Sequence, residues 1–329
     1  MRALTALMAG LALIAGATPG LALQPVETLA TTPGVPLLIE GVARDAAGGL
    51  VLSSVHRGNL VRVTKDGSLV PFGPEGRQAM FGLVADPAGG SLWVASSPSD
   101  NDDRADHPAE LLQIDAATGE VRATYAADGP EHAFGDVAVG PDGAVFVGDT
   151  RGRRILVLRP GAAALEVLAA LPESGSPQGI VVSPDGRWLV FSNYGSGLHR
   201  IEIAGGRYER RDFTAETFTP LPGPEGAELR GIDGLARHGD TIIAIQNGTR
   251  TQRVLSLTMT PDWSAVTARE ALIEGAPLSE PTTGFVEGDA LIFVSRSQWT
   301  DFGPDGRPTS ATPAPAVVSR LSLSPETRP

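Results

Sequence analysis

Six copies of one strand pattern follow one another along the chain. Each copy has a short apolar strand, a turn rich in Asp and Gly, a longer apolar strand, a loop, and a third strand in which apolar and polar residues alternate. The first strands of the copies begin at Glu40, Phe81, Gly135, Gln178, Asp233 and Thr283. These positions are 41 to 55 residues apart, a spacing typical of propeller blades. The pattern therefore predicts an all-β, six-bladed β-propeller.

A fourth, outer strand is expected in each blade. Candidate outer strands follow the third strands at residues 68–72, 121–125 and 165–169. The sixth copy has little chain left after its third strand, so we expect residues 25–31 to supply its outer strand. Pairing between the two ends of the chain would close the ring and leave no sheet edge open.

The first 22 residues have the pattern of a cleaved secretory signal. Arg2 precedes an apolar run at residues 3–17, and small residues follow at Gly20 and Ala22. An uncleaved membrane anchor is the alternative, but the run is shorter than the ~20 residues that cross a bilayer. We therefore expect a signal peptide at residues 1–22 and a single propeller domain at residues 23–329. The mature protein is expected to be periplasmic or secreted, without membrane attachment after cleavage.

The charge and composition of the chain exclude several classes of function. The formal net charge is −12, from 26 Lys and Arg against 38 Asp and Glu, so the protein's own field opposes nucleic-acid binding. The chain has no Cys and only five His, which excludes thiolate zinc sites, redox pairs and Cys nucleophiles. The sequence motifs of serine hydrolases, phosphate loops and zinc proteases are missing too. We expect a small-molecule substrate, and a protein partner stays open.

The starts of the six first strands form a ring at one mouth of the central channel, because first strands line the axis of a propeller. Glu40, Gln178 and Asp233 in this ring carry carboxylate and amide oxygens, which suit a hard cation such as Ca²⁺, Mg²⁺ or Mn²⁺. Without a cation the two acids would repel each other, and one would be pushed towards protonation. The alternative is that these side chains bind strand-end amides or channel water.

Loops that follow the second strands should surround the same mouth. His132, Asn193 and Asn247 lie next to it in this arrangement and are candidate substrate-binding residues, although capping and turn formation explain the same residue types. Trp299 and Phe302 lie in the long segment 295–315 and either cover the channel or pack beside it. The acidic residues 100–107 do not match a calcium-binding EF-hand loop, which favours a solvated insertion.

Four motifs resemble the gluconolactonase and regucalcin (senescence marker protein) family of six-bladed propellers. They are Ile39-Glu40-Gly41, Phe134-Gly135-Asp136, Pro177-Gln178-Gly179 and Ile232-Asp233-Gly234, and the resemblance extends over all six copies. The resemblance implies hydrolysis of a lactone or ester at one divalent cation, held by Glu40, Gln178 and Asp233, with Asp233 also a candidate base. The family has Asn at the positions of Gln178 and Gly135, and Arg at the position of Ala133.

Two functions stay open from the sequence. The first is a divalent-metal-dependent hydrolase of a lactone or related ester, whose cation is Ca²⁺, Mg²⁺, Mn²⁺ or Zn²⁺. The second is a noncatalytic propeller that binds a protein, peptide or small ligand on the same face, because one fold hosts many functions. The departures at Ala133, Gly135 and Gln178 favour the second function more than an unchanged ring would.

Overall fold

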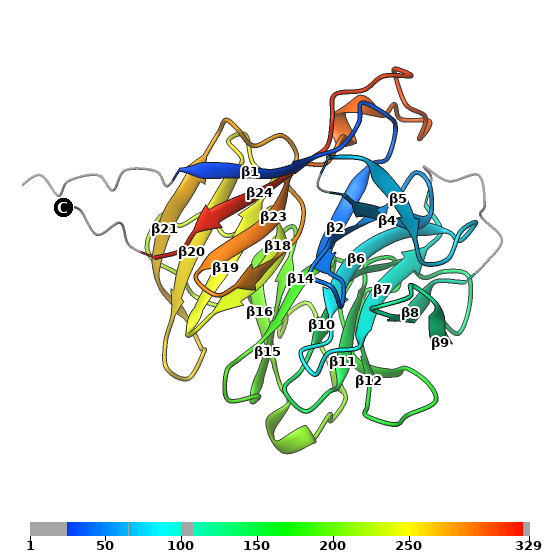
Figure 1. The fold of residues 1–329 in the computed structure, drawn as a ribbon. Helices are drawn as coiled ribbons and strands as arrows, with labels where there is room; N and C mark the ends of the chain where they lie inside the picture. The colour runs from blue at the N-terminus through cyan, green and yellow to red at the C-terminus, as the bar shows by residue number, and fades with distance from the viewer. Residues whose placement is uncertain (1–24, 65, 100–107, 325–329) are drawn as a thin grey trace, which may run out of the picture.

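Six antiparallel sheets form a ring in the computed structural model, which describes residues 25–64, 66–99 and 108–324 (Figure 1). The inner strands are β2 (Ile39–Arg44), β6 (Ala79–Ala85), β10 (Phe134–Val139), β14 (Pro177–Val182), β18 (Ile232–His238) and β22 (Gly284–Glu287). Each inner strand contacts the inner strands of both neighbouring blades, so the six strands surround one central channel. The expected all-β, six-bladed propeller is confirmed.

Three further strands complete a typical blade outwards from the channel. The second strands are β3 (Leu50–Ser54), β7 (Ser91–Ser97), β11 (Val145–Asp149), β15 (Trp188–Asn193), β19 (Thr241–Gln246) and β23 (Ala290–Arg296). The third strands are β4 (Asn59–Val63), β8 (Glu110–Asp115), β12 (Arg154–Leu158), β16 (Gly197–Glu202), β20 (Arg253–Met259) and β24 (Val317–Ser322). The outer strands are β5 (Leu69–Phe72), β9 (Val121–Ala126), β13 (Glu166–Ala170), β21 (Val266–Glu274) and β1 (Val26–Thr31).

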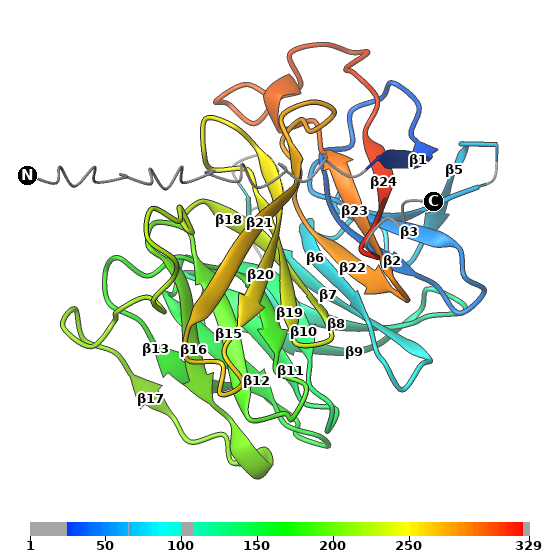
Figure 2. The ribbon, with the colours of Figure 1, turned by 90° about the vertical axis from the view of Figure 1, so that its left-hand side faces the viewer.

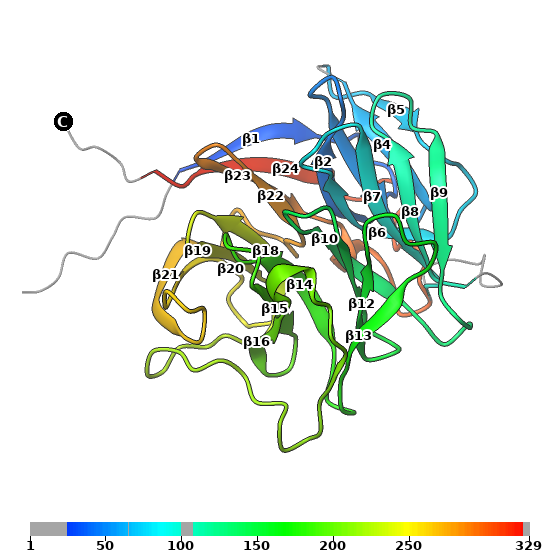
Figure 3. The same ribbon diagram turned by 90° about the horizontal axis from the view of Figure 1, so that it is seen from below.

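The ring closes through the two ends of the described chain. The strand β1 pairs antiparallel with β24, with Val26 opposite Leu321 and Thr31 opposite Val317. Figures 1 and 3 show the blue β1 beside the red β24. Blade 6 therefore takes its outer strand from the N-terminal segment, as the sequence predicted, and its outer edge is covered.

Blades 3 and 4 depart from the expected four strands. Within the described residues blade 4 has three strands, and the segment that follows β16 adds a short parallel strand β17 (Arg211–Asp212) to the edge of β13 instead (Figure 2). Tyr208 and Phe218 of this segment pack into the core between the two blades, beside Phe146 and Phe191. Three prolines at residues 220–224 lack the N–H groups that a fourth strand of blade 4 would need.

Apolar side chains fill the spaces between neighbouring blades. Leu52, Phe146, Phe191 and Phe293 are among the fully buried side chains, and each lies on a second strand. Such burial on both faces of a strand is what a propeller requires of the middle of its blades. No helix in the described part of the chain has the length and apolar character needed to cross a membrane. The expected signal peptide and the acidic residues 100–107 lie outside the described residues.

Inner strands of blades 1 to 5 bulge where they enter their sheets, because the pairing register with the second strand shifts there. In four of these bulges a Gly follows the leading residue, where the neighbouring blade comes close. A Cβ at Gly179 would lie 2.5 Å from the backbone N of Leu235, and one at Gly234 would lie 2.5 Å from the carbonyl O of Thr282. The leading residue of each bulge lines the channel mouth.

Candidate functional site

A cavity of about 460 Å³ occupies the channel mouth at which the inner strands begin, and all six blades contribute to its walls. Glu40, Gln178 and Asp233 line this cavity, so the structure brings together the three residues that the sequence placed there, from blades 1, 4 and 5. Trp299 lines it too. It belongs to the orange loop after β23, which projects at the top of Figures 1 and 2.

Glu40 is held at both its backbone and its side chain. The indole Nε1 of Trp299 donates a hydrogen bond to Oε2 of Glu40 at 2.8 Å, and the hydroxyl of Thr282 donates to its backbone carbonyl at 2.6 Å. Burial, followed by the charges of Asp233 and Asp136, raises the pKa of Glu40 well above its usual value. The bond from Trp299 lowers this pKa but does not cancel the rise. The carboxylate is thus fixed in place, and its charge lacks compensation.

A short chain of hydrogen bonds orients Asp233. Asn247 Nδ2 donates to Asp233 Oδ2 at 2.8 Å and to the carbonyl of Pro281 at 3.0 Å. The phenol of Tyr194 donates to Asn247 Oδ1 at 2.9 Å. Burial, followed by the charge of Asp136, raises the pKa of Asp233 to about 7, against the opposing hydrogen bond from Asn247. Asn247 therefore lines the pocket, as the sequence placed it, and its bonds hold the Asp233 carboxylate.

Asp136 is a third pocket carboxylate, which the sequence reasoning did not select. Its blade has the order Gly135-Asp136, whereas the other bulges have a side chain followed by Gly. The Asp136 oxygens accept hydrogen bonds from the backbone N–H of Val137 at 2.9 Å and of Ile180 at 3.2 Å. Burial raises the pKa of Asp136 to about 6. The reversed order within the bulge was the signal in the sequence that could have identified this residue.

The pocket wall is loosely held at Gln178 and open at Gly135. The amide Nε2 of Gln178 lies 3.4 Å from Ser176 Oγ, which is a long hydrogen bond. A Cβ at Gly135 would meet only Thr150 Cγ2, at 3.6 Å, and the carbonyl of Gly148, at 3.9 Å. The missing side chain at residue 135 therefore adds open space to the pocket.

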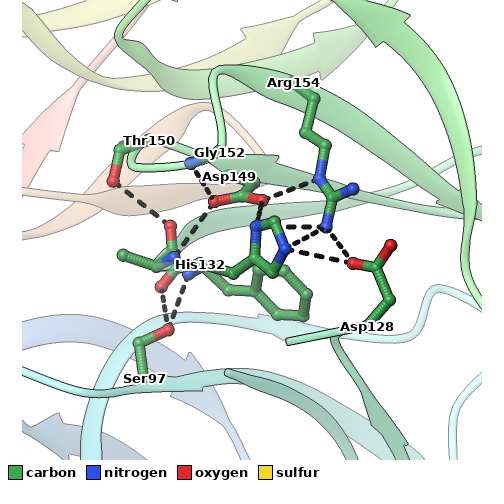
Figure 4. A network of polar contacts seen from close by, with 9 residues as sticks. Ser97, Asp128, His132, Asp149, Thr150, Gly152 and Arg154 are labelled. Carbon is green, nitrogen blue, oxygen red and sulfur yellow. Dashed lines mark hydrogen bonds and ion pairs between the residues drawn. The ribbon is translucent and has the colours of Figure 1, made fainter. Parts of the chain in front are cut away.

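His132 lies in a polar network with Asp128, Asp149 and Arg154 (Figure 4). Its Nδ1 is 2.8 Å from Asp149 Oδ2, and its Nε2 is 3.0 Å from Asp128 Oδ1. Arg154 donates to both of these carboxylates, at 2.9 and 2.7 Å. Asp149 also accepts the backbone N–H of Ala133 at 3.0 Å. His132 is not among the residues that line the pocket, and both of its ring nitrogens face these acids. Its contact with substrate stays a prediction.

Asn193 ends the second strand of blade 4, at the position of Asp149 in blade 3, and is not among the residues that line the pocket. Its side chain is buried, and Oδ1 accepts the backbone N–H of Ser176 at 2.5 Å. Its Nδ2 donates to the carbonyl of Ser174 at 3.2 Å and to Ser196 Oγ at 2.8 Å. These bonds use the amide within its own loop. Contact of Asn193 with substrate therefore stays a prediction too, without support from the pocket lining.

The donor set at the mouth fits a hard divalent cation. Glu40 and Asp233 supply carboxylates and Gln178 supplies an amide oxygen, and no Lys, Arg or His lies among the described residues that line the pocket beside them. Across the described residues, no group of three His, Cys, Asp or Glu side chains is gathered closely enough to hold a metal ion. The expected set has only two carboxylates, and its third donor is an amide.

Comparison with known proteins matches no family model and no curated protein. Solved structures do match. A gluconolactonase from Xanthomonas campestris has 16% identity and a TM-score of 0.61, over 92% of this chain and 90% of that one. A calcium-binding regucalcin from Agrobacterium tumefaciens has 19% identity and a TM-score of 0.58, over 89% and 93%. The PQQ-bound aldose sugar dehydrogenase from Streptomyces coelicolor has 17% identity and a TM-score of 0.62, over 91% and 98%.

These likenesses concern the fold. The expected similarity to gluconolactonase and regucalcin propellers is confirmed in three dimensions, but identities this low show the fold alone. The neighbours also include a dehydrogenase and a lyase, so the fold does not select one reaction. The choice among these chemistries depends on the pocket.

Proposed function

We propose that this protein is a divalent-metal-dependent hydrolase of a small lactone or related ester. The observation that carries the proposal is the convergence of Glu40, Gln178 and Asp233, from three blades, on one cavity. A volume of about 460 Å³ is within the range of small-molecule sites. The gluconolactonases among the structural neighbours support the choice of a hydrolase.

Glu40, Gln178 and Asp233 would hold one cation. When bound, it polarises the substrate carbonyl and lowers the pKa of a bound water. Because all three donor atoms are oxygens, Ca²⁺, Mg²⁺ and Mn²⁺ suit the site better than Zn²⁺. The calcium-binding regucalcin among the neighbours supports this preference.

Asp233 takes the role of general base in this proposal. Asn247 occupies Oδ2 of Asp233, so we assign Oδ1 as the atom that accepts a proton from the attacking water. The water oxygen then bonds to the carbonyl carbon, and the C–O bond to the leaving alkoxide breaks. The proton on Asp233 passes to that alkoxide. Tyr194 keeps the amide of Asn247, and through it the carboxylate, in the orientation this transfer needs.

Three aromatic side chains that line the pocket, Trp299, Phe81 and Phe134, limit access of bulk water to the reacting atoms. Trp299 also fixes Oε2 of Glu40 by its indole N–H.

We further propose that residues 1–22 are a secretory signal, that residues 23–329 are one domain, and that the enzyme acts in the periplasm or outside the cell.

Metal analysis followed by lactone hydrolysis tests the proposal. Purified protein should carry close to one equivalent of a divalent cation, and a chelator should abolish hydrolysis of δ-gluconolactone or a simple γ-lactone until the cation is restored. Asp233→Ala should be inactive, while Glu120→Gln, an exposed acid on the turn between β8 and β9, serves as the matched control. Activity that persists in Asp233→Ala contradicts the proposal.

The noncatalytic alternative has one specific observation in its favour. Ala133 and Gly135 replace two polar residues of the family pattern, and the space at residue 135 is open. A protein that binds small ligands at the pocket but contains no metal and hydrolyses no lactone or ester would establish this alternative.

A further inference from the structure

The walls of the pocket combine aromatic rings with acids. The aromatic residues are Phe81, Phe134, Tyr194 and Trp299. The acidic residues are Glu40, Asp136, Asp233 and Glu280. Among the described residues that line this pocket, none is Lys, Arg or His. Acids and aromatic faces both attract positive charge, because a ring carries negative potential over its face.

Arg154 and Arg253 are paired with acids outside the pocket. Arg154 pairs with Asp149 and Asp128 in the network of Figure 4. Arg253, at the start of β20, lies 3.4 Å from an oxygen of Glu274 and 3.8 Å from one of Glu228, and none of these residues lines the pocket. One divalent cation offsets two of the four negative charges, so a negatively charged substrate would still meet repulsion.

Tyr194 and Glu280 form the outer part of this wall. The Tyr194 side chain is 37% exposed, and its phenol end rests against Gly248, where an added Cβ would lie 2.5 Å from the phenol oxygen. Its hydroxyl is bound to Asn247. The ring is therefore held open to the mouth before any ligand arrives, which lowers the entropy cost of binding.

Glu280 is fixed just as firmly. Its backbone has the left-handed conformation, with φ of 49°, and two hydrogen bonds of 2.9 Å join it to Gln252, one to its carboxylate and one from its backbone N–H. Burial, followed by the charges of Asp233 and Glu280, raises the pKa of Tyr194 to about 12. A left-handed non-Gly residue that lines a pocket is a common mark of a functional position.

We propose that the substrate carries a positively charged ammonium group, which binds between the Tyr194 ring and the Glu280 carboxylate while its ester or lactone carbonyl reaches Asp233. The approach of the carbonyl to Asp233 rests on the proposed hydrolase function. Recognition of an organic cation at the mouth rests on the pocket walls alone. Desolvated cation–aromatic contacts and a fixed carboxylate together discriminate a cation from a neutral molecule of the same shape.

A matched pair of esters tests the proposal. Acetylcholine and 3,3-dimethylbutyl acetate have the same shape, and only the first is charged. Acid release by the metal-loaded protein should give a kcat/KM for acetylcholine about tenfold or more above that for the neutral ester. Glu280→Gln, which keeps an oxygen for Gln252, should bring the ratio towards one, and so should Tyr194→Leu. Glu120→Gln should keep the preference of the unchanged protein.

Calorimetry with tetramethylammonium chloride separates this inference from the proposed function. Binding that weakens in Glu280→Gln, in a protein that hydrolyses neither ester nor the lactones named above, would reject the hydrolase and support recognition of a cation. Equal rates for the two esters, or a faster neutral ester, would overturn the inference while the hydrolase stands. A protein that hydrolyses neither these esters nor the lactones, and does not bind tetramethylammonium, overturns both.

Discussion

Blade 3 differs from blades 4 and 5 at two places, the bulge of its inner strand and the end of its second strand. Its bulge carries Gly135-Asp136, with the acid in the slot where other bulges have Gly. Its second strand ends in Asp149, whereas blades 4 and 5 end in the neutral Asn193 and Gln246. The backbone repeats around the ring, but these two changes place two negative charges in one blade.

The comparison shows what a neutral and a charged side chain need at the same position. Asn193 bonds to backbone groups and to Ser196 Oγ of its own loop without any ionised partner. Gln246 donates to two backbone carbonyls, and its amide oxygen accepts only a long bond of 3.4 Å from Arg253. Asp149 also accepts backbone N–H groups, but its side chain has no exposed surface and is accompanied by Arg154 and His132. A buried charge is tolerated only with such partners. Blade 3 therefore holds the buried charge of Asp149 by ion pairs with Arg154 and His132.

The largest expected effect separates the acids of blades 5 and 3. Asp233→Asn should lower kcat for lactone hydrolysis by about 10²–10⁴-fold, because an amide cannot accept the proton of the attacking water. Asp136→Asn should lower it far less, since Asp136 already accepts two backbone N–H bonds. Steady-state kinetics on both metal-loaded variants measures the difference. Equal losses would mean that the two acids share the role of base.

Removing the charge at the end of the blade 3 strand should be the next largest effect. Asp149→Asn should destabilise the protein by about 3–5 kcal/mol, because Arg154 then keeps only Asp128, which is exposed, as an acidic partner. Urea unfolding measures this change. The double variant Asp149→Asn/Arg154→Met should recover part of the loss. A single variant as stable as the unchanged protein would show that blade 3 tolerates a neutral side chain, as blade 4 does.

Asp136 should give blade 3 a pH dependence of its own. Its pKa is about 6 in the folded protein against 3.8 as the usual value, so the folded state binds the proton more tightly than the unfolded state. Ionisation therefore destabilises the metal-free protein as the pH rises from about 4 to about 6, by up to about 3 kcal/mol. Asp136→Asn should make this slope shallower in urea unfolding with a chelator present, while the contributions of Glu40 and Asp233, whose pKa values are also raised, remain. An unchanged slope would contradict the assignment.

The sequence predicted the ring and a large part of the mouth. Repeated strand patterns placed the inner strands, and the short sixth copy predicted the closure by β1. Position within the repeat also brought Glu40, Gln178 and Asp233 to one cavity, because leading residues of inner strands must meet there. Their roles in metal binding and catalysis stay predictions.

Other features depend on details that a repeat pattern does not carry. Asp136 sits one residue beyond the leading position, and the slot it fills is apparent only from the bulge. His132 and Asn193 are at the right strand ends, but hydrogen bonds to nearby groups turn them away from the cavity. Glu280 comes from a loop before the sixth inner strand, outside the repeat positions. The strand β17 forms because a segment crosses to a neighbouring blade, which local patterning does not encode.

The smallest expected effect compares the glycines of two bulges directly. Gly234→Ala should destabilise the protein by about 1–3 kcal/mol, because the new Cβ would lie 2.5 Å from the carbonyl O of Thr282 and 3.0 Å from the Cα of Thr283, both backbone atoms. Gly135→Ala should change stability by less than about 1 kcal/mol, and in the stabilising direction, since its Cβ meets nothing closer than 3.6 Å and the unfolded chain loses freedom. Paired urea unfolding curves measure the difference. Equal destabilisation would mean that the blade 3 bulge is as tightly packed as the blade 5 bulge, and that the open space beside Asp136 is already filled by the fold.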